Sequence, residues 1–356
     1  MRKFLIKLSY TVFPLWILVV GLVLYTSLYV DKQSGGDIGS LLLIPFGNDY
    51  NQMLEEKTIN KKLYRTINSI KELKTINTDV LTIGDSFSQQ NNSGYQNYLS
   101  NMGMTVINCN SLLYDSPFLF AYNILDKGIV DSTNTKVLVL ERVEREMKSE
   151  INKFDFKNNK EKWDSELTID TNHVFKSKNK WSITRVRDMI LYKISQSKSP
   201  VYTANLDRDF FSSDEPRKLY FYHHDIMYGA NIDIKKEKNP REVFDILQTK
   251  AKEKGISLIL LVAVDKYDLY QNHIEKNPFP LKTINEDLVE AIGETPSLLI
   301  TKDYLAPLIE KGEKDVFKFT DTHWSYKASK VVANELFNRI RMMNATVNSS
   351  SKKITN

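Results

Sequence analysis

The sequence predicts an α/β protein with a mostly parallel sheet that helices cover on both faces. Four short segments rich in Val, Leu and Ile are spaced along the chain: TDVLTIG (78–84), MTVINC (104–109), TKVLVLE (135–141) and ISLILLVAV (256–264). Continuous apolar character is typical of strands buried on both faces, and the intervals between the first three segments are compatible with helices. Strands separated by helices favour a parallel sheet in a three-layer sandwich.

Length and composition fit one globular domain with elaborations. The chain has 356 residues, of which 42% are hydrophobic and 11% aromatic, so a sizeable core can form. Its 49 Lys and Arg against 44 Asp and Glu give a net charge of +5, a smaller basic excess than a nucleic-acid-binding protein normally has. The single cysteine, Cys109, excludes an intramolecular disulfide and a multi-thiolate metal site.

An uncharged apolar run over residues 8–30 predicts a transmembrane anchor. As a helix its 23 residues reach roughly 34 Å, enough for a hydrocarbon core of about 30 Å. A cleaved signal peptide is the alternative, but the run is longer than the usual apolar core of ~7–15 residues, and no small-x-small site precedes Asp31. Arg2, Lys3 and Lys7 before the run favour a cytoplasmic N-terminus, which places the rest of the chain outside the cytoplasm.

The predicted domain boundaries follow from changes in composition. Residues 1–30 form the cytoplasmic N-terminus and anchor, and residues 31–48 begin with a polar, Gly/Ser-containing stretch that predicts a flexible stalk. The globular domain is expected over 49–343, with an insertion at about 146–235 that is rich in Lys, Asn and Asp. The polar tail, residues 344–356, is expected to be disordered.

Helices are predicted from spacing and from stop signals. Residues 49–75 contain no Gly or Pro and predict a helix, and a second helix over 240–254 ends at Gly255. Apolar residues at helical spacing predict a final helix over 326–343, with Ser325 placed to cap it. Within the insertion, the sequence predicts one helix near 183–195 and an aromatic-rich strand at 218–225.

The strongest chemical signal is Gly84-Asp85-Ser86-Phe87-Ser88, where the first strand ends. A serine at the carboxyl end of such a strand exposes its hydroxyl where open α/β sheets bind ligands. Neighbouring backbone N–H groups can then face a developing oxyanion. A turn that only caps a helix explains the same residues equally well.

A serine nucleophile needs a base, and His323 is the best placed of the five histidines. It lies in TDTHWS (320–325), directly before the last predicted helix. The Asp321 carboxylate, two residues earlier, can reach the imidazole on one side of an extended segment. A carboxylate that fixes the imidazole tautomer and an imidazole that accepts the serine proton form a Ser-His-Asp system. A helix N-cap is the alternative interpretation.

Taken together, the two motifs resemble the SGNH/GDSL hydrolase superfamily. Within that superfamily, TDTHWS is similar to the SGNH-like domain of the alginate O-acetyltransferase family, whose members modify exported polysaccharides. The resemblance covers roughly residues 78–343, patchily through the insertion. It implies an SGNH-like three-layer sandwich in which Ser86 is the nucleophile, His323 the general base and Asp321 its orienting partner.

The sequence departs from the pattern of the SGNH family at the residues that form the oxyanion hole. The resemblance implies that the Ser86 N–H contributes, but the glycine and asparagine that complete the hole in many SGNH enzymes have no clean match. The candidates for oxyanion or substrate contacts are Asp85, Asn110, Arg145 and Trp324. For Trp324, packing against the final helix is favoured over stacking on a sugar. The serine precedes the Asp-x-His element, as in ordinary SGNH enzymes, whereas some alginate-acetylation proteins have the reverse order.

The resulting expectation is an O-acetyltransferase that modifies a cell-envelope or exported polysaccharide through an acyl-serine. Because acetyl-CoA is cytoplasmic, the resemblance implies an integral-membrane acyltransferase partner as the acetyl donor. The same residues are compatible with a carbohydrate esterase, since water in place of a sugar hydroxyl converts transfer into deacetylation. A non-catalytic polysaccharide-binding or assembly subunit is a third alternative. The chemistry requires no cofactor, and the histidines offer no metal-ligand spacing.

Overall fold

The computed structural model describes residues 2–25, 35–42, 47–55, 57–156, 168–169, 187, 191, 194, 199–227 and 238–354. Much of the predicted insertion, including most of the helix expected near 183–195, lies outside these residues.

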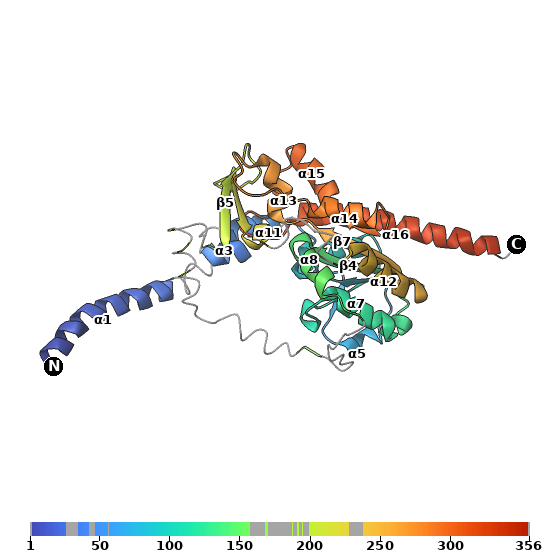
Figure 1. The fold of residues 1–356 in the computed structure, drawn as a ribbon, viewed down its shortest axis with the longest axis horizontal. Helices are drawn as coiled ribbons and strands as arrows, with labels where there is room; N and C mark the ends of the chain where they lie inside the picture. The colour runs from blue at the N-terminus through green and yellow to red at the C-terminus, as the bar shows by residue number, and fades with distance from the viewer. Residues whose placement is uncertain are drawn as a thin grey trace.

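A six-stranded parallel sheet forms the centre of the molecule (Figure 1). Its strands are β1 (Arg65–Ile67), β2 (Val80–Ile83), β3 (Val106–Cys109), β4 (Val137–Val143), β7 (Ser257–Ala263) and β8 (Leu298–Ile300), in the order β1-β3-β2-β4-β7-β8. All five pairings are parallel, which confirms the predicted sheet. The four predicted strands are β2, β3, β4 and β7, whereas the two edge strands, of three residues each, were not predicted.

Helices cover both faces of the sheet and bury two apolar cores. Neighbouring residues of one strand point to opposite cores, as Val139 and Leu140 do, because side chains alternate along a strand. On the Val139 side lie α6 (Tyr95–Asn101), α15 (Lys302–Glu310) and α16 (Tyr326–Ile354). On the Leu140 side lie α5 (Ile70–Leu73), α7 (Pro117–Asp126), α8 (Glu144–Lys153), α12 (Pro240–Glu253) and α14 (Ile284–Ile292). The three-layer sandwich is thereby confirmed.

The region predicted as one helix over 49–75 is divided instead. It contains α4 (Gly47–Glu55), then strand β1, then α5. Ser69 begins α5 as a cap, because its hydroxyl accepts a hydrogen bond from the Glu72 N–H. Pairing of β1 with β3 overrides the local helix compatibility of this segment.

Both ends of the predicted domain also differ from expectation. The stalk is not a free linker over its described part, because α3 (Asp37–Leu42) packs on the domain and Ile38 is fully buried. The last helix, α16, does not end at Met343 but continues to Ile354. The cap predicted for α16 is present, since the Ser325 hydroxyl accepts from the Lys327 N–H at 3.2 Å.

A small antiparallel sheet lies within the predicted insertion. It consists of β5 (Val201–Asn205) and β6 (Lys218–Tyr222), and β6 confirms the strand expected at 218–225. Two short helices, α11 (His224–Met227) and α13 (Lys266–Tyr270), lie close to β6. The α12 helix ends as predicted at Gly255, whose φ of +69° suits glycine.

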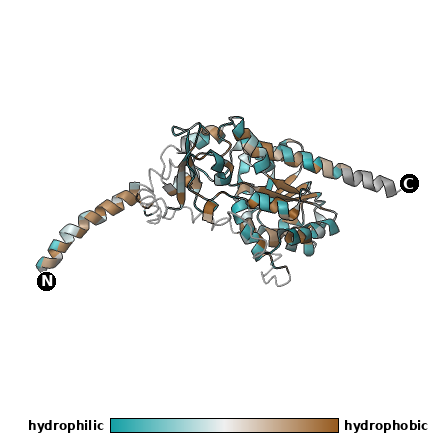
Figure 2. Cartoon of the chain, turned by 45° about the horizontal axis from the view of Figure 1, so that its top comes forward, coloured by the Kyte–Doolittle hydropathy of each residue, from teal (hydrophilic) through white to brown (hydrophobic). Residues whose placement is uncertain are grey.

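The N-terminal helix α1 (Arg2–Tyr25) is a candidate membrane span. Its segment Ile6–Tyr25 has 20 residues with a mean hydropathy of 2.0, and it is the one helix in the described part of the chain that is long and apolar enough to cross a membrane. Figure 2 shows this helix as a largely hydrophobic rod that projects from the domain. By length and composition a signal sequence passes the same test.

Candidate active site

Ser86 lies at the switch point of the sheet. It is the first residue of a 3₁₀ turn, Ser86–Gln89, that directly follows β2. The next strand along the chain, β3, lies on one side of β2, and the following strand, β4, lies on the other. Crevices at such a point, outside the carboxyl ends of parallel strands, are where open α/β sheets bind ligands. Ser86 is exposed there, as a nucleophile must be.

A buried glutamate holds the Ser86 turn, which we define as residues 84–89. The Glu141 carboxylate accepts hydrogen bonds from the Asp85 N–H at 3.0 Å and from the Ser88 hydroxyl at 2.8 Å. A side chain at Gly84 would collide with both Glu141 and Ser88, so glycine is required by close approach. Burial, together with the negative charge of Asp85, raises the pKa of Glu141 well above its usual value. Sequence reasoning missed this residue, although a charge at the end of the apolar segment VLVLE was a signal.

Asp85 stabilises the turn and does not face the pocket. One carboxylate oxygen accepts from the Phe87 N–H at 3.0 Å, which caps the 3₁₀ turn, and the other accepts from the Val143 N–H at 2.9 Å. Both oxygens therefore bind backbone N–H groups, and Asp85, expected as an oxyanion or substrate contact, is not among the residues that line the pocket described below. The GDS motif thus contains both a cap and an exposed serine.

The second motif forms a hairpin-like loop, residues 317–324, which we call the His323 loop. An isolated bridge between Phe317 and Trp324 closes it. Within the loop, His323 Nδ1 lies 2.6 Å from Asp321 Oδ1, a hydrogen-bond distance that places the Nδ1 proton toward the carboxylate. His323 Nε2 is buried without a hydrogen-bond partner among the described residues. A free Nε2 lone pair is what a general base requires.

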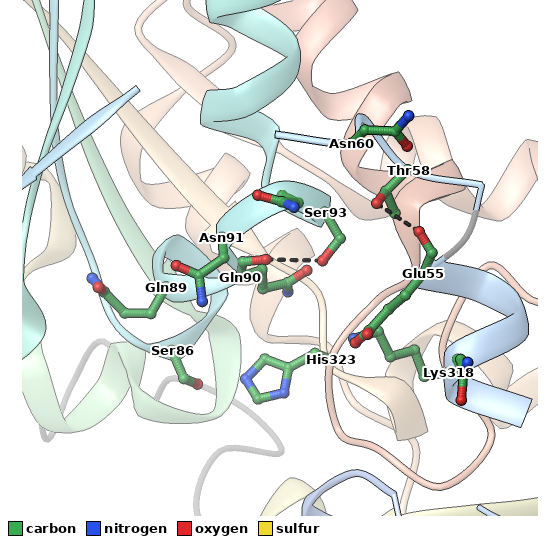
Figure 3. Close-up of a pocket in the computed structure, with 12 residues that line it drawn as sticks. Glu55, Thr58, Asn60, Ser86, Gln89, Gln90, Asn91, Ser93, Lys318 and His323 are labelled. Atoms are coloured by element: carbon green, nitrogen blue, oxygen red, sulfur yellow. Dashed lines mark hydrogen bonds between the residues drawn. The ribbon is translucent and has the colours of Figure 1, made fainter. Parts of the chain in front are cut away.

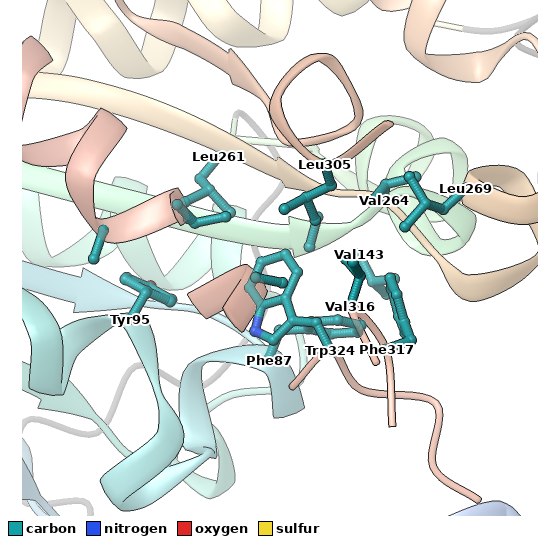
Figure 4. Packing of buried hydrophobic residues seen from close by; sticks show 14 of the residues in the cluster. Phe87, Tyr95, Val143, Leu261, Val264, Leu269, Leu305, Val316, Phe317 and Trp324 are labelled. Carbon is teal, nitrogen blue, oxygen red and sulfur yellow. The ribbon is translucent and has the colours of Figure 1, made fainter. Parts of the chain in front are cut away.

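Phe87 brings the two motifs together. Its ring packs against the His323 imidazole, with centroids 4.9 Å apart, and edge-on against Trp324 at 4.8 Å (Figure 4). Ser86 and His323 therefore line the same pocket, and Figure 3 shows the serine hydroxyl directed toward the imidazole. Ser86 thus lies beside His323, whose Nδ1 contacts Asp321, while no hydrogen bond joins the Ser86 hydroxyl to Nε2 among the described residues.

The carboxylates around His323 favour its charged form. Burial lowers the pKa of His323, but the charge and hydrogen bond of Asp321 and the charge of Asp37 outweigh it, so the pKa is raised. For Asp321, burial acts to raise the pKa, yet His323 and Lys318 hold it well below the usual value. The aspartate is therefore ionised at neutral pH and stabilises the charged form of His323.

Acyl transfer should accordingly need a pH above the ordinary histidine range. Only the neutral imidazole accepts a proton, so kcat/KM is expected to rise with pH through an apparent pKa above about 6.5, the ordinary value for histidine. The measurement is the initial rate of 4-nitrophenyl acetate turnover from pH 5 to 9. If kcat/KM instead rose with an apparent pKa well below 6.5, the result would contradict this arrangement of charges.

Lys266 holds the His323 loop from beneath. This lysine is fully buried, and its ammonium donates to the backbone carbonyls of Lys318 and Phe319, both at 2.7 Å, and of Asp321 at 3.2 Å. Burial lowers the pKa of Lys266 to about 7, and its three contacts with carbonyl oxygens hold the backbone that carries Asp321 and His323.

Lys266→Met is expected to destabilise the fold and to lower activity. The methionine fills similar volume but removes the donor to the Phe319 and Asp321 carbonyls, at about 1–3 kcal/mol each, while the Lys318 carbonyl keeps the Asp321 N–H at 3.5 Å. Thermal unfolding and the rate of ester turnover measure the two effects. Lys136→Met, at an exposed ion pair with Asp79, is the matched control and should change neither. Equal behaviour of the two variants would refute the role of Lys266.

The pocket beside Ser86 and His323 is a polar cavity of about 730 Å³ (Figure 3). Carboxamide side chains supply half of its lining: Gln52, Asn60, Gln89, Gln90, Asn91 and Asn92. The remaining lining residues are Glu55, Thr58, Ser86, Ser93, Lys318 and His323. Both amide atoms of Gln90 are buried without a hydrogen-bond partner among the described residues.

Three further residues predicted as oxyanion or substrate contacts do not line this pocket. Asn110 donates to the Asn68 side chain at 2.8 Å, and Arg145 pairs with the buried Asp225 at 3.1 Å. The Trp324 indole is fully buried, which confirms packing and excludes a sugar-stacking platform. These side chains are occupied by structural contacts.

The remaining candidate donors to an oxyanion lie in and beside the Ser86 turn. The Ser86 N–H is the first amide of the 3₁₀ turn, where helical geometry supplies no acceptor, and it has no partner among the residues that the structure describes. Gln90, from the same stretch of chain, adds a carboxamide donor on the pocket wall. Both groups are suited to stabilising an oxyanion.

The dyad also belongs to a group that satisfies a distance test for metal ligands. Asp37, Asp321 and His323 offer ligand atoms within 4.8 Å of one another, and this is the one such group found in the described residues. However, Asp321 Oδ1 and His323 Nδ1 lie 2.6 Å apart, whereas ligands of one tetrahedral ion at about 2.0 Å are roughly 3.3 Å apart. The arrangement fits a shared proton better than a shared metal ion.

Comparison with known proteins supports the family resemblance for the C-terminal part of the chain. Residues 220–355 match the family described as the SGNH hydrolase-like domain of the acetyltransferase AlgX. The match contains Asp321 and His323, and the resemblance read from the sequence is confirmed there. Ser86 lies outside the matched residues. No curated protein and no solved structure matches the chain.

Proposed function

We propose, from the premise that this chain carries an SGNH-like domain of the AlgX acetyltransferase type, that it is a membrane-anchored O-acetyltransferase. Its domain would act outside the cytoplasm on a cell-envelope or exported polysaccharide. The observation that carries the proposal is the Asp321–His323 dyad, whose unpartnered Nε2 shares a pocket with the exposed hydroxyl of Ser86.

The proposed reaction has two symmetric steps. First, His323 Nε2 accepts the Ser86 hydroxyl proton while Oγ attacks the acyl carbon, and the Ser86 N–H stabilises the oxyanion. The imidazolium returns its proton to the departing oxygen of the donor, which leaves an acyl-serine. Second, Nε2 accepts a proton from a sugar hydroxyl, which attacks the acyl-serine. The serine oxygen then recovers its proton, and the acetyl ester of the sugar is released.

The lining of the pocket supports a hydroxyl-rich acceptor. A carboxamide presents both donors and an acceptor, so neighbouring carboxamides can bind the hydroxyls of a sugar in either sense. Six of the twelve lining residues are of this type. A polysaccharide chain is the acceptor proposed, and a membrane-embedded acyltransferase is proposed as the donor, because an extracytoplasmic enzyme has no direct access to cytoplasmic acetyl-CoA.

The exposure of Ser86 supports a second candidate function, a carbohydrate esterase. Water that reaches an exposed acyl-serine can replace the sugar hydroxyl in the second step. The two functions share every residue of the first step. They differ only in which hydroxyl the imidazole activates after the acyl-serine has formed.

An acyl-enzyme experiment tests the proposal. The full chain, solubilised in detergent, is incubated with 4-nitrophenyl acetate, and its intact mass is recorded with and without neutral oligosaccharides. The expected result is one added acetyl group on Ser86 that oligosaccharides remove with formation of sugar acetates. Release of free acetate alone would favour the esterase. A protein that neither gains an acetyl group nor turns over the ester would refute both enzyme functions.

A further inference from the structure

The chain segment that follows the apolar helix packs directly against the His323 loop. In α3, Ile38 is fully buried and belongs to the same apolar core as Phe87 and Trp324. The Gly39 N–H donates to the Thr320 carbonyl at 2.8 Å. Gly36, with a φ of +81°, approaches the same carbonyl so closely that a side chain there would collide with it.

Asp37 joins this segment to the catalytic dyad. Its carboxylate accepts from the Thr322 N–H at 2.7 Å and also from the Thr322 hydroxyl. The second of its oxygens lies 3.9 Å from His323 Nδ1. The Asp37 side chain is 42% exposed, yet partial desolvation and the negative charge of Asp321 raise its pKa above the usual value. Asp37 therefore fixes the residue between Asp321 and His323 and places a second carboxylate beside the imidazole.

The next helix continues the same contact. From α4, Asn51 donates to the Thr320 hydroxyl at 3.2 Å, and Tyr50 donates to the Asp315 carboxylate at 2.6 Å. This region also supplies one wall of the pocket through Gln52, Glu55, Thr58 and Asn60. The candidate active site is thus built from both ends of the chain.

We infer that Asp37 is a positioning residue for His323, so that the active site is complete only when the segment after the apolar helix is docked on the His323 loop. This inference rests on the proposed function. The charged groups that face His323 are Asp321 and Asp37, which favour the imidazolium, and Lys318, which opposes it. Like Asp321, Asp37 favours the charged imidazole, and its hydrogen bonds to Thr322 restrain the loop that contains Asp321 and His323.

The same contact sets an upper limit on the distance between the His323 loop and the end of the apolar helix. Only twelve residues lead from Tyr25, the end of α1, to Asp37. A fully extended chain of this length spans roughly 40 Å. Asp37, which contacts the His323 loop, therefore lies within about 40 Å of the end of the apolar helix. A pocket held at this distance suits a donor presented at the membrane surface.

Substitution of Asp37 in the full-length protein tests the inference. Asp37→Asn is expected to lower kcat for 4-nitrophenyl acetate roughly tenfold with little change in KM, because the imidazolium that forms during the reaction loses a carboxylate 3.9 Å from Nδ1. It should also move the acid limb of the pH–rate profile to lower pH, because a charge that favours the imidazolium is removed. Asp37→Glu should restore part of the rate, which a purely structural defect would not explain.

The control is Asp245→Asn, an exposed position on α12 outside the pocket, and thermal unfolding reports on folding. An unchanged kcat and an unchanged acid limb in Asp37→Asn would overturn the inference while the wild-type enzyme still forms its acyl-serine. A lower rate with an unmoved acid limb and no rescue by glutamate would equally overturn it. Failure of the proposed function is distinguishable, because the wild type itself would then remain unacylated.

Discussion

Ser86→Ala is expected to reduce acyl transfer by roughly 10⁴-fold or more and to abolish the acetylated form of the protein. Ser86 is the exposed hydroxyl that shares a pocket with the free Nε2 of His323, and no other side chain of the turn can replace it. Ser88 is buried, and its hydroxyl contacts Tyr95 and Glu141. Because Ser86 is exposed, the alanine variant should fold as the wild type does.

Intact mass and ester turnover measure this effect. Ser132→Ala is a matched control. Ser132 is an exposed serine that precedes β4, so it lies near the amino ends of the strands, whereas Ser86 lies at their carboxyl ends. It should acylate at the wild-type rate. Acylation of Ser86→Ala at an undiminished rate would show that another residue carries the acyl group and would remove the basis of the proposed mechanism.

Asp321→Asn is expected to lower kcat by about 10⁴-fold, as loss of the orienting carboxylate does in Ser-His-Asp systems. An asparagine amide facing Nδ1 favours the tautomer that carries its proton on Nε2, which cannot accept the serine proton. The imidazolium also loses its nearest negative charge, 2.6 Å from Nδ1. The measurement is single-turnover acylation, which isolates the step that His323 catalyses.

A double variant tests whether Asp37 and Asp321 act on the same imidazole. If Asp37 supports the same imidazole, Asp321→Asn retains residual activity that the Asp37→Asn, Asp321→Asn double variant loses, and the two effects are not additive. Asp245→Asn again serves as the control. Wild-type acylation by Asp321→Asn would contradict the assignment of the dyad.

The candidate nucleophile, the Asp321–His323 pair and four strands of the sheet could be predicted from the sequence, because each depends on a short stretch of chain. Continuous apolar segments predicted β2, β3, β4 and β7, since strands buried on both faces have no polar side. A serine directly after one of them and an Asp-x-His element before the last helix were visible as local motifs. The resemblance to SGNH enzymes then assigned them roles.

Other features required the tertiary structure. Strand β1 has only three residues, which is too short for a periodic pattern, and it forms because it pairs with β3. Asp85, Asn110 and Arg145 were plausible pocket residues by position, but hydrogen bonds to partners elsewhere in the chain engage each of them. A sequence shows which side chains are polar and does not show which of them are already satisfied.

The sequence by itself determined the four central strands of the sheet, the candidate nucleophile and the Asp321–His323 pair, because these depend on neighbouring residues. Only the tertiary structure decided what holds them in place. Glu141 contacts a turn 53 residues away, Lys266 supports a loop 52 residues away, and Asp37 reaches Thr322 across 285 residues. Contacts over such separations leave no spacing pattern, since their geometry exists only after the chain has folded.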